Sequence, residues 1–155
     1  MKIDLIIYDF DGVMTDNRVL VTEDGQEAVF VNRSDGLAIG TLREMGVEQI
    51  IVSTEKNPVV NARAKKLGLP CIQSVKDKRS TVQKYLQEKN IDPKNVIFAG
   101  NDINDKEAME YVGWPIAPAD AHPDVKKVAR IVLKTKGGHG VIRELLDKVT
   151  GGRTK

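Results

Sequence analysis

The sequence predicts an α/β fold: a doubly wound, Rossmann-like parallel sheet flanked by helices, with a small inserted β-hairpin and no cap domain. Short apolar runs alternate with helical patterns along most of the chain, as in parallel sheets covered on both faces. Acidic and polar residues follow the expected strand ends, where such sheets bind ligands. The 155 residues suit one globular domain, which we place at residues 1–150, with residues 151–155 as a free tail.

The first expected strand, residues 3–8, is an apolar run too short for a helix. A β-hairpin is expected over about residues 18–31, because two apolar segments flank an Asp24-Gly25 turn. An isolated two-stranded ribbon is marginally stable in water. We therefore expect this apolar hairpin to pack against another surface, such as a second copy of the chain.

The rest of the chain alternates helices and strands. Helical spacing of apolar residues, with glycine or proline at several ends, predicts helices at 34–45, 59–67, 79–89, 103–109, 125–129 and 141–149. Short apolar runs predict strands at 49–53, 71–73, 96–99, 114–117 and 131–133. Between these elements there is no room for an additional domain.

Composition excludes several classes of function. Lys and Arg number 24 against 22 Asp and Glu, a net charge of +2, which argues against general attraction to nucleic acid or acidic membranes. One cysteine cannot form an internal disulfide, and no cysteine cluster resembles a zinc site. The N-terminus enters the first strand without a signal peptide, and no apolar stretch approaches 18 residues. We therefore expect a cytoplasmic protein.

Two carboxylates, Asp9 and Asp11, follow the first strand one residue apart. Residues i and i+2 of an extended chain face the same way, so both can share a hard cation through oxygen ligands. Other polar motifs follow the later strands: Ser53-Thr54, then Lys78, then Asn101-Asp102 with Asp105. Carboxylates and an amide oxygen suit Mg²⁺, whereas a hydroxyl and an ammonium suit a phosphate group.

This ordered set of motifs resembles the haloacid dehalogenase superfamily of phosphohydrolases, over essentially the whole chain. The resemblance implies that Asp9 is the nucleophile and that Asp11 is the acid and then the base. It implies that Ser53 and Lys78 hold the phosphoryl oxygens. It also implies a Mg²⁺ ion held by Asp9, the main-chain carbonyl of Asp11 and a side chain of the fourth motif.

The fourth motif departs from the family pattern, which usually begins Gly-Asp, because here it begins Gly100-Asn101-Asp102. Either Asn101 supplies a neutral oxygen to the ion, with Asp102 and Asp105 adding charge around it, or Asp102 reaches the ion itself. Both possibilities stay open at this point. The pair Asn104-Asp105 is also compatible with a helix N-cap.

The lack of a cap domain resembles the sugar-acid phosphatases of the 3-deoxy-octulosonate 8-phosphate and nonulosonate 9-phosphate type. The resemblance implies a homotetramer in which hairpins pack together and each C-terminal segment reaches a neighbour's site. The segment that contains Gly137 and Gly138 resembles their glycine-rich tail motif, which places these two glycines among the substrate-binding residues; the alternative is a flexible loop.

Thr54-Glu55, Arg63 and Lys66 guide the choice of substrate. Glu55, Arg63 and Lys66 resemble a trio that nonulosonate 9-phosphate phosphatases place around the sugar acid; alternatively, Arg63 and Lys66 lie on a solvated helix face. The expected activity is therefore Mg²⁺-dependent release of phosphate from a nonulosonate (sialic-acid-type) 9-phosphate through an aspartyl-phosphate intermediate. The alternative is 3-deoxy-D-manno-octulosonate 8-phosphate, in lipopolysaccharide synthesis.

Three other classes were weighed. A receiver domain phosphorylates an aspartate after its third strand and carries an adjacent acidic pair, unlike Asp9 and Asp11. A dehalogenase has no role for Asp11. A non-catalytic tetramerisation module, related to the C-terminal domains of cytidylyltransferases, would retain the apolar hairpin, but the presence of Asp9, Asp11, Ser53 and Lys78 opposes it.

Overall fold

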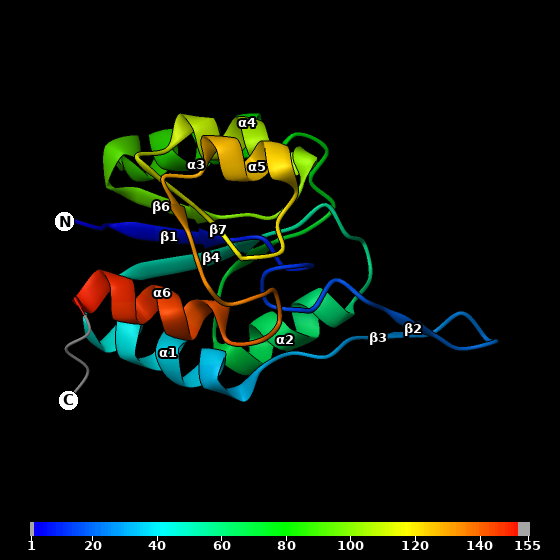
Figure 1. The fold of residues 1–155 in the computed structure, drawn as a ribbon. Helices are drawn as coiled ribbons and strands as arrows, with labels where there is room; N and C mark the ends of the chain where they lie inside the picture. Colours follow the sequence, from blue (N-terminus) through cyan, green and yellow to red (C-terminus); the bar gives the residue numbers. More distant parts are fainter. Residues whose placement is uncertain (1, 152–155) are drawn as a thin grey trace.

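The computed structural model describes residues 2–151, and its centre is β1 (Leu5–Tyr8). This strand lies within a six-stranded parallel sheet of order β5-β4-β1-β6-β7-β8 (Figure 1). The other strands of the sheet are β4 (Glu48–Val52), β5 (Cys71–Ile72), β6 (Val96–Ala99), β7 (Trp114–Ala117) and β8 (Ile131–Val132). The predicted doubly wound parallel sheet is confirmed.

Helices connect the strands and cover both faces of the sheet (Figure 1). They are α1 (Arg33–Glu44), α2 (Val59–Leu67), α3 (Lys78–Lys89), α4 (Ile103–Tyr111), α5 (Pro123–Val128) and α6 (Val141–Thr150), with a 3₁₀ turn, η1 (Pro93–Asn95). None of the helices in residues 2–151 is long and apolar enough to cross a bilayer. Gly151 ends α6 in a left-handed conformation, and residues 152–155 of the predicted tail lie outside the described residues.

The sheet separates two apolar cores, because successive side chains of a strand point to opposite faces. Ile6 and Tyr8 of β1 pack with α1, α2 and α6, whereas Leu5 and Ile7 pack with α3, α4 and α5. All four residues of β1 are buried, as expected for a central strand of a parallel sheet. Burial on both faces therefore holds β1 in one position in the sheet. The segment that follows it, beginning at Asp9, is positioned by the same packing.

The inserted hairpin is shorter than predicted. Its ladder consists of β2 (Leu20–Val21) and β3 (Glu27–Ala28), paired antiparallel with Leu20 opposite Ala28. Val19 and Phe30 lie outside this ladder, although the sequence pattern included them. The hairpin extends away from the body of the molecule (Figure 1), and its apolar side chains are exposed, with Phe30 at 76%.

Candidate active site

Three polar residues follow the carboxyl ends of three neighbouring strands. Asp9 follows β1, Ser53 follows β4 and Asn101 comes two residues after β6. Because β1 pairs with both β4 and β6 in parallel register, these ends meet at one edge of the sheet, at the point where the winding reverses direction. They line a cavity of about 170 Å³ together with Asp11, Asn17, Thr54, Glu55, Asp102 and Asn104. The predicted crevice is therefore present.

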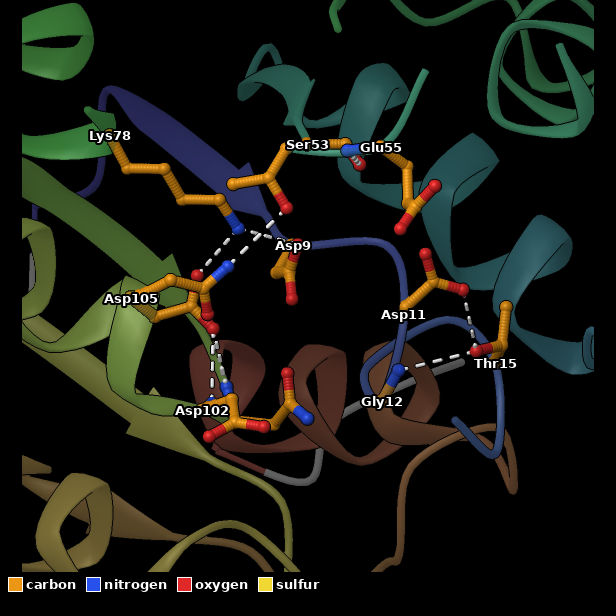
Figure 2. Close-up of polar contacts among 12 residues, drawn as sticks. Asp9, Asp11, Gly12, Thr15, Ser53, Glu55, Lys78, Asp102 and Asp105 are labelled. Carbon is orange, nitrogen blue, oxygen red and sulfur yellow. Dashed lines mark hydrogen bonds and ion pairs between the residues drawn. The ribbon is translucent and has the colours of Figure 1, made fainter. Parts of the chain in front are cut away.

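Lys78 bridges two carboxylates, one of which, Asp9, lines this cavity (Figure 2). It is the first residue of α3, and its Nζ lies 2.6 Å from Oδ1 of Asp9 and 2.6 Å from Oδ1 of Asp105. All three side chains are buried. Burial alone would lower the pKa of Lys78, but the attraction of Asp9 and Asp105 outweighs it, and the pKa is raised. The lysine is therefore a buried cation.

The carboxyl group of Asp9 is buried and has a raised pKa. Burial and the nearby charge of Asp105 raise its pKa to about 7, against the opposing effect of Lys78. A cation beside its second oxygen would stabilise the carboxylate further, because opposite charge favours the ionised form. The chemistry of Asp9 therefore calls for positive charge in addition to that of Lys78.

A place for such a cation exists between Asp9, Asp11 and Asn101. The end of the Asn101 amide lies 2.9 Å from the carbonyl oxygen of Asp11 and 3.0 Å from Oδ2 of Asp9. If the amide nitrogen of Asn101 occupies this position, it donates hydrogen bonds to the Asp11 carbonyl and to Asp9 Oδ2. If the amide oxygen occupies it, three oxygens face one another. Adjacent oxygens around an octahedral Mg²⁺ lie roughly 2.9 Å apart, given Mg–O distances of about 2.1 Å.

The oxygens of this site do not belong to a cluster of acidic side chains. Within residues 2–151, no group of three His, Cys, Asp or Glu side chains is arranged to hold a metal. The three oxygens instead come from one carboxylate, one amide and one main-chain carbonyl, which are all hard ligands suited to Mg²⁺. Gly12 makes the arrangement possible, because a Cβ there would lie 1.9 Å from Nδ2 of Asn101. The residues present fit a hard divalent cation.

Asp102 and Asp105 organise the backbone of the fourth motif. Oδ2 of Asp105 accepts the N–H groups of Asn101, at 2.9 Å, and of Asp102, at 3.2 Å. The Asp102 side chain is exposed and caps α4 by accepting the N–H of Ile103. Asp102 is thus the N-cap residue of α4, and Asp105 in the first turn completes a capping box with it, so the predicted cap at Asn104-Asp105 is correct only for Asp105. Asn101 is buried with its amide facing Asp9 and Asp11, so it is a better candidate than Asp102 for a metal ligand.

Asp11 lies at the mouth of the cavity, partly buried, opposite Glu55 (Figure 2). Burial and the charge of Glu55 raise its pKa, while the hydrogen bond from Thr15 lowers it. Thr15 Oγ1 donates to Asp11 at 3.3 Å and accepts the N–H groups of Gly12 and Asn17. Thr15 thus holds Asp11 in place. No role was predicted for Thr15 from the sequence, although it lies in the segment Gly12–Asp16 that extends the first motif.

Ser53 and Thr54 form the wall contributed by β4. Ser53 is buried, and its Oγ accepts the N–H of Glu55 at 3.1 Å. The hydroxyl proton can therefore be directed toward a group in the cavity. Thr54 is partly buried and accepts a hydrogen bond from the Asn104 amide at 3.4 Å, which joins this wall to α4.

A second cavity of about 170 Å³ continues the first toward the hairpin. Asp11, Asn17 and Glu55 line both cavities. The remaining walls come from the base of the hairpin and the chain before α2: Arg18, Val19, Glu27, Val29, Asn57 and Val59. Asn17 has a positive φ of 68°, a conformation in which asparagine is favoured among side-chain-bearing residues. Apart from Asp11 and Glu55, the sequence analysis did not identify these residues.

Two predicted substrate contacts lie away from both cavities. Arg63 is partly buried in α2 and donates to the carbonyl oxygen of Asn32 at 3.2 Å. Lys66, one turn further on, is exposed. Within one chain these side chains do not join Glu55 at the site, so their assignment as substrate-binding residues stays a prediction.

Gly137 and Gly138 lie against the back of the first-motif loop of their own chain. The N–H of Gly138 donates to the carbonyl oxygen of Val13 at 3.0 Å. A Cβ at Gly137 would lie 2.2 Å from the carbonyl oxygen of Gly12, and one at Gly138 would lie 2.4 Å from the nitrogen of Asp16. Only glycine permits this close approach. Their predicted role in binding substrate remains untested.

A parallel sheet with a lysine-paired carboxylate and a hard-cation site at its switch point defines the class of α/β phosphohydrolases. Residues 48–145 match the model of the haloacid dehalogenase-like hydrolases, and the chain belongs to that family. It is 34% identical over 147 residues to the 3-deoxy-D-manno-octulosonate 8-phosphate phosphatase of Escherichia coli K12, covering 94% of this chain and 78% of that protein. The predicted phosphatase class is confirmed.

Solved structures agree with this assignment. A haloacid dehalogenase family hydrolase from Streptomyces avermitilis has a TM-score of 0.92 and 45% identity, covering 94% of this chain and 90% of that chain. The cobalt-bound deoxy-D-mannose-octulosonate 8-phosphate phosphatase of Haemophilus influenzae has a TM-score of 0.92 and 26% identity, covering 98% and 90%. The fold of the family therefore extends over nearly the whole chain.

Proposed function

We propose that the protein is a Mg²⁺-dependent phosphatase of a phosphorylated sugar acid, with 3-deoxy-D-manno-octulosonate 8-phosphate as its substrate. The observation that carries the proposal is that Asp9, which lines one cavity together with Asp11 and Asn101, is held by Lys78 on one side and faces the Asn101 amide on the other. The curated relatives at 32–34% identity act on this octulosonate phosphate, which favours it over the nonulosonate 9-phosphate. The distance of Arg63 and Lys66 from the cavities supports the same choice.

The side chains around the cavity suit transfer of a phosphoryl group in two steps. In the first, a carboxylate oxygen of Asp9 attacks phosphorus, the ester P–O bond breaks, and Asp11 gives its proton to the leaving alkoxide. In the second, Asp11 takes a proton from water, whose oxygen attacks phosphorus and releases inorganic phosphate and free Asp9. The raised pKa of Asp11 suits a group that begins as an acid.

The remaining groups would hold the phosphoryl oxygens and the metal. Lys78 and Ser53 offer an ammonium and a hydroxyl close to Asp9. Asp9, the carbonyl of Asp11 and Asn101 would hold Mg²⁺, which would neutralise the negative charge of the transferring group. The cobalt-bound form of the Haemophilus influenzae relative supports a divalent ion in this fold.

The second cavity suits the sugar part of the substrate. It opens beside Asp11, which would protonate the sugar oxygen, and its walls carry Glu27, Glu55 and Asn57, which can accept hydrogen bonds from hydroxyl groups. Arg18 also lines this wall, with its guanidinium paired to Asp16 at 2.7 Å. Phosphate and sugar would thus occupy adjoining spaces.

We also infer a homotetramer built through the hairpins. Leu20, Val21 and Phe30 are 63%, 58% and 76% exposed, which is costly for apolar side chains on a free ribbon and marks an interaction surface. The base of the same hairpin lines the second cavity. Assembly would therefore fix one wall of the substrate site.

Phosphate release from a panel of substrates tests the activity. The panel contains octulosonate 8-phosphate, N-acetylneuraminate 9-phosphate and its deaminated analogue, and an aryl phosphate, each with and without Mg²⁺. A preference of about 100-fold for the octulosonate, roughly 2.7 kcal/mol of transition-state discrimination, is expected. The same preference for a nonulosonate would transfer the assignment to that substrate. No Mg²⁺-dependent release from any compound would contradict the catalytic function.

The Asp9→Asn variant is the matched control for this panel. It keeps the size of the side chain and one oxygen, but it replaces the nucleophilic carboxylate by an amide. Activity should fall to background with every substrate, because no aspartyl-phosphate can form. Retained activity would show that the release comes from another group or a contaminant.

A further inference from the structure

Asp35 is a buried carboxylate of α1 that contacts the first turn of α6, far along the chain. Its Oδ1 accepts the N–H groups of Ile142, at 3.0 Å, and of Arg143, at 3.1 Å. The residue that precedes α6 is Gly140, which has no side chain to cap the helix. Asp35, which is only 3% exposed, therefore caps α6 from α1, although it is 107 positions before Ile142 in the chain.

The capping arrangement is costly, which indicates that it does more than satisfy two N–H groups. Oδ2 of Asp35 has no hydrogen-bond partner within the described residues, and a buried unpaired polar atom costs free energy. Burial raises the pKa of Asp35 to about 6, although the N–H groups of Arg143 and Ile142 oppose this rise. At neutral pH the group is thus an anion at a helix N-terminus, the position where negative charge is stabilising.

The first turn of α6 continues directly into the contact with the catalytic loop. Immediately before the helix, Gly137 and Gly138 lie against the backbone of residues 12–16, closely enough that no Cβ would fit. Thr15 of that loop donates its hydroxyl to Asp11. A shift of α6 would therefore move the glycines, then the loop, and then the carboxyl group of Asp11.

We propose that Asp35 is a positioning residue: by fixing the start of α6, it holds Gly137 and Gly138 against the first-motif loop and so orients Asp11 for proton transfer. The inference rests on the proposed function, in which Asp11 protonates the leaving group. It adds a residue outside the cavity to those on which the reaction depends. Asp35 does not line either cavity of the site, so it has no direct contact with substrate.

The dependence of activity on the leaving group tests this role. Protonation matters greatly for an alkyl phosphate, such as octulosonate 8-phosphate, and little for p-nitrophenyl phosphate, whose leaving group is stable as an anion. Both esters share the second step, in which Asp11 acts as the base, so the comparison is made on the first step, as release of the alcohol or phenol in a single turnover. Since general acid catalysis contributes roughly 100-fold or more, Asp35→Ala should lower the single-turnover rate of this step about 100-fold for the alkyl ester and less than about threefold for the aryl ester. Asp35→Asn, which keeps an oxygen for both N–H groups, should stay near the wild type.

A merely structural role would give a different pattern. Leu86→Ala removes a buried side chain from the last part of α3, on the opposite face of the sheet from α6. It should lower the thermal midpoint while leaving the ratio of the two activities unchanged. If Asp35→Ala lowers the single-turnover rate of the first step alike for both esters, as loss of folded protein would, the positioning role is overturned.

Two further variants separate the possible failures. Asp11→Asn should show the same selective loss in the single-turnover release of the alcohol from the alkyl ester; if it shows none, the role of Asp11 and this inference both fail. If Asp11→Asn shows the selective loss and Asp35→Ala does not, only the inference about Asp35 fails. Should Asp35→Ala not fold, Arg143→Pro takes its place, because it removes one N–H that Asp35 accepts, within the first helical turn, where proline is tolerated best. The selective loss is again expected, and its absence would overturn the proposal.

Discussion

Oδ1 of Asp9 lies 2.6 Å from Nζ of Lys78, although the two residues are 69 positions apart in the chain. The lysine also contacts Asp105, so one buried ammonium lies between two buried carboxylates. Such a group of charges is stable only while every member is present, because removing one leaves an uncompensated charge in a poorly solvated place.

The first prediction follows from this contact. Lys78→Met should abolish phosphate release and lower the free energy of unfolding by about 3–5 kcal/mol, the usual cost of breaking a buried ion pair. Urea unfolding and a phosphate assay measure the two effects. Lys84→Met is the matched control in the same helix, since Lys84 pairs with Glu88 at the surface; it should change neither property. A Lys78→Met protein as stable as the wild type would contradict the buried ion pair.

The second prediction concerns the ligand of the metal in the fourth motif. Asn101→Ala should weaken Mg²⁺ binding about tenfold or more, or at least 1.4 kcal/mol, because it removes one of three converging oxygens. Asn101→Asp should strengthen binding by adding a carboxylate. Asp102→Asn, which keeps an oxygen to cap α4, should bind Mg²⁺ like the wild type. Calorimetric titration with Mg²⁺ distinguishes these variants, and weaker binding by Asp102→Asn alone would make Asp102 the ligand.

Local patterns were sufficient to predict the fold and the placement of Asp9, Ser53 and Asn101 after the ends of neighbouring strands. Apolar runs such as residues 3–8 predict strands, because a strand buried on both faces shows little alternation of apolar and polar residues. The motifs come together because the carboxyl ends of parallel strands meet at one edge of the sheet. The contact of Lys78 with Asp105 depends on the packing of α3 beside α4, which no short pattern encodes. The same holds for Asp35 and α6, whose contact joins residues 107 apart.

The errors in the hairpin have a physical cause. An apolar alternating segment predicts a strand, but Val19 and Phe30 have no partner strand in the sheet of one chain, so the ladder ends at Leu20–Val21 and Glu27–Ala28. The second cavity was also missed for the most part, because its walls come from two segments, the base of the hairpin and the chain before α2.

The third prediction is a pH dependence of stability due to Asp35. Its pKa is about 6 in the folded protein, against an ordinary value of about 3.9 in an unfolded chain. Between these values the folded state binds more protons, so stability falls as pH rises from about 4 to 6. The accumulated loss is about 3 kcal/mol, at about 1.4 kcal/mol for each pH unit.

Urea unfolding of the wild type and of Asp35→Asn, between pH 4 and pH 8, isolates this contribution. The difference between their free energies of unfolding should change by about 3 kcal/mol across this range, with the wild type losing stability relative to the variant as pH rises. Other titrating groups cancel in the difference, since both proteins contain them. Parallel curves would show that the pKa of Asp35 does not differ between the folded and unfolded states.

The fourth prediction concerns the hairpin surface. Leu20 and Phe30 are 63% and 76% exposed, so replacing both by Asp removes no packing within the chain and should leave the fold intact. The double variant should dissociate to monomers in sedimentation experiments, because buried charge opposes an apolar interface. Its KM for the sugar-acid phosphate should rise, because the base of the hairpin lines the second cavity. Val132→Asp alters another exposed apolar residue, on β8, and should change neither property. A wild-type protein that is already monomeric at assay concentration, or a double variant that remains assembled, would exclude the hairpin as the contact between subunits.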